Sequence, residues 1–162
     1  LTGHSDEVKC LAKLTLDDID KYLLSGSDDA TIKVWDIDQT KCIKTLKEHT
    51  NTVTELITFK DDGRDYFASC SLDLTIKVWD TLNFVSLFTL TGHKGFSSSL
   101  SSTFNNGKLF IVSSSQGEVK VWDFKERTVF KSIISKSRWS QNTLFKYCEL
   151  VLLVDADFDI QT

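Results

Sequence analysis

The chain has 162 residues, of which 41% are hydrophobic and 26% are charged, and its formal net charge is −4. These values are typical of a globular domain with a buried core, and they exclude wholesale disorder. The negative charge repels nucleic acid and anionic membranes on average, and the lysines form no basic patch, so we expect neither as a partner. No signal peptide and no apolar run of membrane length is present.

The chain has four cysteines, Cys10, Cys42, Cys70 and Cys148, and no Cys-x-x-Cys pair, so a zinc knuckle is unsupported. The first three lie in strand-like runs and are expected to be small buried thiols. A reducing compartment fits this pattern best, and we expect a cytoplasmic location, with a nuclear or cytoskeleton-associated one as alternatives. The lack of methionine and the start at Leu1 favour an internal piece of a longer protein.

The first part of the chain predicts four short strands, over residues 8–16, 22–27, 31–35 and 42–46. In the third run Ile32 and Val34 face one way while Lys33 and Trp35 face the other, as a pleated strand requires. Short polar turns rich in aspartate separate the runs, and no helical period occurs.

Later parts of the chain repeat this pattern. The second unit has strand-like runs at 52–59, 66–71, 75–79 and 84–90, and the third at 96–104, 109–114, 118–122 and 129–134. A fourth unit has runs at 139–145, 149–154 and 158–162, and it stops before a tryptophan arrives. The serine-rich run 97–102 is interpreted as a degenerate first strand because the period continues through it, with a flexible linker as the alternative.

Two residue types mark a common period. Tryptophans recur at Trp35, Trp79 and Trp122, at intervals of 44 and 43 residues, and each is followed by aspartate. A histidine precedes each tryptophan, at His4, His49 and His93, at intervals of 45 and 44 residues. Two marks with one period indicate a repeat protein.

With Gly-His near the start of a unit, Trp-Asp near its end and a period of about 44 residues, the chain resembles the WD-repeat β-propeller family. The resemblance covers all 162 residues. It implies an all-β fold of four-stranded antiparallel blades around a central channel, here three complete blades plus most of a fourth. We expect blades at about 4–46, 49–90, 93–134 and 136–162, as part of a longer propeller. A self-closed or dimerised ring and a naturally truncated protein are the alternatives.

The resemblance also implies a hydrogen-bonded set in each blade, made by a loop histidine, a serine on the second strand, a turn aspartate and the tryptophan. The matching residues are His4, Ser25, Asp29 and Trp35 in the first unit and His49, Ser69, Asp73 and Trp79 in the second. The third unit keeps His93 and Trp122 but places Val112 and Gln116 at the serine and aspartate positions, and the fourth has Lys136 and Asp157. We therefore expect the third and fourth blades to be less rigid, or to satisfy these groups differently. Because the set recurs in each unit, a structural role is favoured over hydrolase chemistry.

In this family the third residue after the loop histidine tends to face the top surface, which implies a partner-binding rim at Glu7, Thr52, Phe96 and Trp139. The residue before the turn aspartate points to the same rim and adds Asp28 and Leu72. Phe96 and Trp139 are the strongest candidates because aromatic side chains carry much of the binding energy of interfaces. The alternative is that they fold inward, over Ser97 and Ser140.

The sequence therefore predicts a non-enzymatic scaffold that binds other proteins or peptides through its top face. We expect no cofactor, no metal and no small-molecule substrate, since no cluster of histidine, cysteine or acid pairs stands outside the repeat. The alternative is the substrate-recognition subunit of a ubiquitin ligase. Receptors that dock on the cullin-4 adaptor resemble each other in a Trp-Asp-x-Arg signature, but the last position here holds Asp38, Leu82 or Lys125.

Overall fold

The structure, a computed structural model, describes residues 2–16, 19–97 and 99–134 of the chain. These residues form strands joined by turns and loops, and no helix is found among them, so none offers a helical membrane span. The predicted fourth unit, with Trp139 and Asp157, lies outside the described residues.

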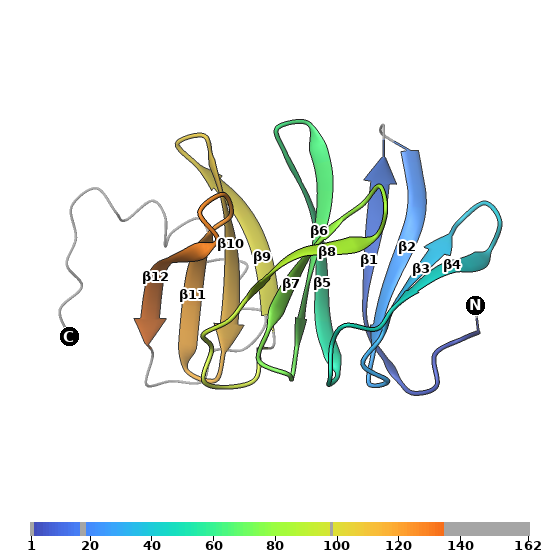
Figure 1. Cartoon of the computed structure of the whole chain (residues 1–162), viewed down its shortest axis with the longest axis horizontal. Helices are drawn as coiled ribbons and strands as arrows, with labels where there is room; N and C mark the ends of the chain where they lie inside the picture. The colour runs from blue at the N-terminus through green and yellow to red at the C-terminus, as the bar shows by residue number, and fades with distance from the viewer. Residues whose placement is uncertain (1, 17–18, 98, 135–162) are drawn as a thin grey trace.

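The strands form three four-stranded sheets, which we call the first, second and third blades (Figure 1). The first blade consists of β1 (Val8–Leu16), β2 (Ile19–Ser27), β3 (Ile32–Asp36) and β4 (Lys41–Leu46). The second consists of β5 (Val53–Asp61), β6 (Arg64–Ser71), β7 (Ile76–Asp80) and β8 (Val85–Leu90). The third consists of β9 (Ser99–Asn105), β10 (Lys108–Ser115), β11 (Glu118–Asp123) and β12 (Thr128–Ile134). All neighbouring strands pair antiparallel in chain order, which confirms the predicted all-β fold and blade architecture in the described part of the chain.

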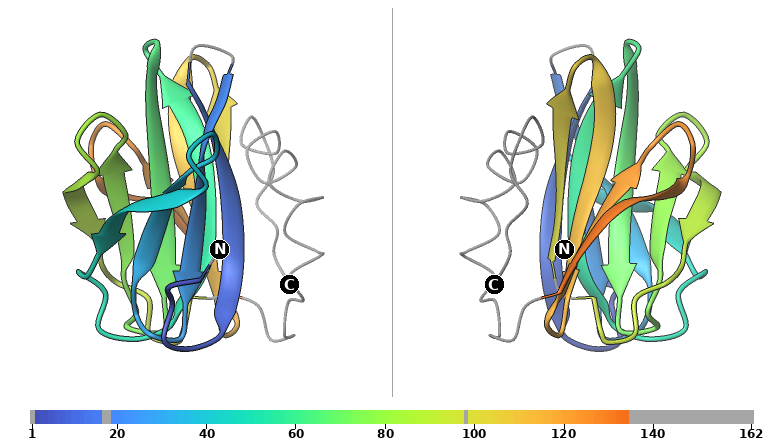
Figure 2. Two further views of the ribbon diagram at one scale, coloured as in Figure 1. Left: turned by 90° about the vertical axis from the view of Figure 1, so that its right-hand side faces the viewer. Right: turned by 90° about the vertical axis from the view of Figure 1, so that its left-hand side faces the viewer.

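The blades stand side by side, and each first strand lies on the same inner side of the molecule. Strand β5 contacts β1 and β2 of the first blade, and β9 contacts β5 and β6 of the second. Figure 2 shows β1, β5 and β9 along one side and the outer strands β4, β8 and β12 along the other. This stacking follows from the period-two pattern, because each blade has apolar side chains on both faces and must bury them against its neighbours.

The core lies between the blades. At the first interface, Leu24, Ile32 and Val34 of the first blade pack against residues of the second blade that include Phe67 and Trp79. The Phe67 and Trp79 rings are stacked, with centroids 5.6 Å apart. A second cluster joins the second and third blades in the same way. Burial of this apolar area, at about 25 cal/mol per Å², is the main favourable contribution to folding.

One face of the first blade has no such neighbour in the described part of the chain. Val8 and Leu11 are 50% and 60% exposed, whereas Val53 and Leu56, at the same register positions of the second blade, are 0% and 5% exposed. Val8 and Leu11 line a hollow on this face together with Leu23 and Trp35. The first blade therefore presents an open face with the apolar pattern that the second blade buries.

Candidate functional site

The loops that carry His4, His49 and His93 gather with the β2–β3, β6–β7 and β10–β11 turns at one edge of the blades, the lower edge in Figure 1. We call this edge the histidine-loop face. It is the surface on which the family resemblance implied a partner-binding rim.

In the first blade the structure brings the four expected residues together. The His4 ring lies with Nδ1 2.8 Å from Asp29 Oδ2 and Nε2 2.7 Å from Ser25 Oγ. Trp35 Nε1 donates to the same serine oxygen at 2.8 Å. Because the loop, β2, the following turn and β3 each contribute one member, the set joins four segments of the blade.

The second blade has the same arrangement. His49 Nδ1 lies 2.7 Å from Asp73 Oδ2, His49 Nε2 lies 2.8 Å from Ser69 Oγ, and Trp79 Nε1 donates to Ser69 Oγ at 2.9 Å. The two sets agree within 0.1 Å in each distance.

The proton positions in this set follow from its donors and acceptors. An indole N–H can only donate, so Ser69 Oγ accepts from Trp79 and gives its own proton to Nε2 of His49. The remaining imidazole proton is then on Nδ1 and is donated to Asp73, a tautomer assigned from the network. The chain of donors therefore runs in one direction, from the buried tryptophan to the aspartate at the loop.

The aspartate is held ionised by its neighbours. Burial acts to raise the pKa of Asp73, but hydrogen bonds from Thr75 and His49 outweigh it and lower this pKa to about 2. The Thr75 hydroxyl and amide donate to Oδ1 at 2.7 and 2.9 Å, and the Thr50 amide donates to Oδ2 at 3.1 Å. Burial lowers the pKa of His49, so the imidazole is neutral at pH 7.

In the third blade the prediction was wrong about two members of the set. Ser113, rather than Val112, lies 2.6 Å from His93 Nε2 and accepts from Trp122 Nε1 at 2.7 Å. Glu118, rather than Gln116, lies 3.1 Å from His93 Nδ1. Here β10 and β11 are joined by only two residues between the paired Ser115 and Glu118, which is a shorter connection than in the other blades. Counting back from Trp122 by the serine-to-tryptophan interval of the first two blades therefore reaches Val112, which lies on the opposite face of β10 from Ser113.

The sequence did contain a signal for Ser113. This serine follows its histidine by 20 residues, as Ser69 follows His49, so counting forward from the histidine identifies it. Glu118 had no such signal, because its longer side chain reaches the imidazole from β11 rather than from the turn. The third blade therefore satisfies these groups differently, as one of the two expected outcomes had it: the network there is complete, and Lys120 pairs with Glu118 at 2.7 Å.

Acidification is expected to destabilise the protein between about pH 7 and pH 5, because burial lowers the pKa of both His49 and His93. In that range the unfolded imidazoles, with pKa values near 6.5, take up protons that the folded ones refuse. Stability is therefore present above the unfolded pKa and is lost as pH falls, by at most about 1.4 kcal/mol per pH unit for each imidazole. Urea unfolding at several pH values measures this slope.

His49→Asn is the control for this pH dependence, because it removes one titrating ring and should make the slope shallower. A stability that rises on acidification through this range would contradict the neutral state of the imidazoles.

The serine hydroxyls of these sets are not placed as nucleophiles. Ser25, Ser69 and Ser113 are 3%, 0% and 0% exposed, and each oxygen already accepts from an indole. Among the described residues no cluster of three histidine, cysteine or acidic side chains could hold a metal ion. Burial raises the pKa of the Cys10 and Cys70 thiols to about 12, so neither is a reactive thiolate.

Five of the six predicted rim residues lie in the described part, on the histidine-loop face. Hydrogen bonds join four of them: Asp28 N to Glu7 O at 2.9 Å, Thr52 Oγ1 to Asp28 Oδ1 at 2.9 Å, and Leu72 N to Thr52 O at 3.0 Å. Phe96 is 49% exposed, which contradicts the alternative that its ring folds inward.

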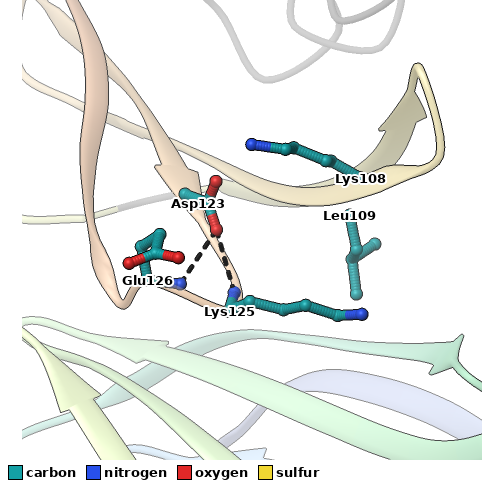
Figure 3. A pocket seen from close by; sticks show the side chains of 5 residues that line it. All are labelled: Lys108, Leu109, Asp123, Lys125 and Glu126. Atoms are coloured by element: carbon teal, nitrogen blue, oxygen red, sulfur yellow. Dashed lines mark hydrogen bonds between the residues drawn. The ribbon is translucent and has the colours of Figure 1, made fainter.

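A small pocket lies towards the opposite edge, lined by Lys108, Leu109, Asp123, Lys125 and Glu126 (Figure 3). The Asp123 carboxylate accepts hydrogen bonds from the backbone amides of Lys125 and Glu126, at 3.0 and 2.9 Å. This carboxylate closes the β11–β12 turn. Among the described residues, no hydroxyl, thiol or imidazole lines the pocket beside it, so we assign the pocket to the structure of the turn.

Three segments, residues 1–36, 40–80 and 84–123, match the model of the family described as "WD domain, G-beta repeat". The chain therefore belongs to the WD40-repeat family, as the repeat period and the histidine networks indicated. A crystal structure of RRP9 WD40 repeats is similar, with a TM-score of 0.70 and 25% sequence identity over 85% of this chain and 42% of that one.

Several curated relatives are similar over about one repeat. The probable E3 ubiquitin ligase complex SCF subunit sconB of Talaromyces stipitatus is 40% identical over 57 residues, which are 35% of this chain and 8% of that protein. Coatomer subunit beta'-2 of Arabidopsis thaliana is 43% identical over 54 residues, 33% of this chain and 6% of that protein. The ribosome biogenesis protein BOP1 homolog of Anopheles gambiae is 36% identical over 45 residues, 28% of this chain and 5% of that protein. The chain thus spans less than a tenth of each of these relatives.

Proposed function

We propose that the chain is a non-enzymatic scaffold that binds other proteins or peptides through the histidine-loop face. The observation that carries this proposal is the contrast between two groups of residues on that face. The histidine, serine and tryptophan side chains form hydrogen bonds within their own blades. Phe96, by contrast, is half exposed, beside loops that those hydrogen bonds hold in place. Large exposed aromatic side chains on a rigid frame are typical of interaction surfaces.

The relatives support a scaffold more than any single pathway. Their printed names assign them to a ubiquitin ligase complex, a coatomer and ribosome biogenesis, so similar repeats serve in different assemblies. The ubiquitin-ligase alternative gains no advantage from the sconB match, because the coatomer match has comparable identity and coverage. We propose a cytoplasmic location on the cysteine usage alone.

Site-directed photo-crosslinking in cells tests the proposal. A photoreactive amino acid is placed at Phe96 in the protein as it is expressed in cells, and at Leu82 as the control. Leu82 is 81% exposed but lies in the β7–β8 turn, away from the histidine-loop face. We expect crosslinked proteins from position 96 and few from position 82. Equal crosslinking at both positions, or none at position 96, would contradict the proposal.

A further inference from the structure

The rim residues lie on the same face of three adjacent blades, and we call them together the rim patch: Glu7, Asp28, Thr52, Leu72 and Phe96. Asp28 of the first blade accepts a hydrogen bond from Thr52 of the second. Thr54 Oγ1 then donates to the carbonyl of Ser97, at 2.9 Å, in the segment that follows Phe96. These contacts place the loops of neighbouring blades against one another, so one extended ligand can touch all of them.

The first-blade end of the rim patch is acidic. Three exposed or half-exposed carboxylates, Asp6, Glu7 and Asp28, lie there, with Lys9 as the ammonium that pairs with them. Lys9 lies 2.7 Å from Glu7 and 2.9 Å from Asp28, so it compensates one charge of the three. The remaining negative charge favours a cationic side chain and repels phosphate.

The other end of the rim patch is apolar. Leu72 occupies the second-blade position that Asp28 holds in the first, and Phe96 occupies the third-blade position of Glu7 and Thr52. The Phe96 ring is 49% exposed and Leu72 is half buried. Charge thus gives way to apolar surface along the rim from the first blade to the third.

Among the described residues, the loop that carries Phe96 also forms fewer contacts with its own blade than the equivalent loops of the first two blades do. In the first two blades strand pairing reaches Val8↔Ser27 and Val53↔Ser71, whereas in the third the last pair among the described residues is Ser99↔Ser114.

Serine hydroxyls show the same difference. Ser27 and Ser71 donate to loop carbonyls at 3.2 and 3.0 Å. The third-blade equivalent, Ser115, and the nearby Ser97 are buried, and their hydroxyls have no hydrogen-bond partner in the described part of the protein. Buried hydroxyls of this kind are costly to leave unpaired, so within this described part the third-blade loop lacks a stabilising contact that the equivalent loops of the first two blades have.

We propose that the rim patch binds an extended peptide segment of a partner protein that carries a lysine or arginine and, a few residues further along, a large apolar side chain. The basic side chain lies against the acidic cluster of Asp6, Glu7 and Asp28, and the apolar one lies against Leu72 and Phe96. This inference rests on the proposed scaffold function and specifies the class of segment that the scaffold recognises.

Selection of displayed peptides tests this specificity. A library of random short peptides is selected against the full-length protein, and the recovered peptides should be enriched in a basic residue followed by a large apolar one. Labelled copies of a recovered peptide should bind the double variant Glu7→Lys/Asp28→Lys at least about tenfold more weakly, because this change reverses two charges at the contact. Phe96→Ala should weaken binding by a similar factor.

Matched variants with the same chemistry elsewhere are the controls. Asp38→Lys/Glu126→Lys makes the same charge change in exposed turns at the other ends of the blades, and Leu82→Ala removes an exposed apolar side chain there. Both should bind the recovered peptide as the unchanged protein does.

Acidic peptides, peptides without the basic and apolar pair, or equal binding by the rim and control variants would overturn the inference. If proteins still crosslink at position 96 in that case, the scaffold function stands and only the peptide class is wrong. If position 96 also yields no crosslinks, both are wrong.

Discussion

Replacing Ser69 with alanine is expected to lower the free energy of unfolding by roughly 2–5 kcal/mol. Its hydroxyl accepts from Trp79 and donates to His49, and both partners are buried. The substitution therefore leaves a buried N–H and a buried ring nitrogen without partners, each costing about 1–3 kcal/mol. Urea unfolding followed by tryptophan fluorescence measures the loss.

Ser115→Ala is the matched control, because it removes a buried serine hydroxyl that has no hydrogen-bond partner within the part of the chain that the structure describes. Its effect should lie within about 0.5 kcal/mol of zero, or be slightly stabilising, since no bond is lost and a polar group leaves the interior. Equal losses for the two variants would mean that the hydrogen-bonded set contributes little and that serine volume alone matters.

The contrast between these serines also shows how far the sequence could predict the site. In the first two blades the histidine, serine, aspartate and tryptophan stand at the intervals that the repeat implies, and the structure joins them by hydrogen bonds. In the third blade a shorter β10–β11 turn moves the serine by one position relative to the tryptophan. Neighbouring residues of a strand point to opposite faces. A shift of one position therefore points to Val112, a core residue, in place of Ser113, the hydrogen-bond partner of His93.

Exposure could not be predicted in the same way. Phe96 stands at a repeat position that also holds glutamate and threonine, and whether an aromatic ring there turns inward depends on the space that the neighbouring blade leaves. Likewise Leu11 and Leu56 are the same residue at the same position of β1 and β5, paired with Ser25 and Ser69. A repeat specifies which face is apolar, but only the assembled blades decide whether that face is covered.

Leu56→Ala is therefore expected to cost roughly 2–4 kcal/mol, whereas Leu11→Ala should cost less than about 1 kcal/mol. Leu56 is 5% exposed within the interface between the first and second blades, so its removal leaves a cavity lined by neighbours that include Leu24 and Phe67. Leu11 is 60% exposed on the open face of the first blade, where little apolar area is buried to be lost. Urea unfolding of the two variants, made in the chain of 162 residues, gives the comparison directly.

The same pair of variants in the full-length protein distinguishes two states of the open face. If Leu11→Ala stays mild there, the face is exposed to solvent and its apolar residues stabilise nothing. If its cost rises to that of Leu56→Ala, another sheet packs on Leu11 as the first blade packs on Leu56, since both are leucines at the same register position and burial sets the cost of truncation. A mild effect of Leu56→Ala in either chain would contradict the packing of the first two blades itself.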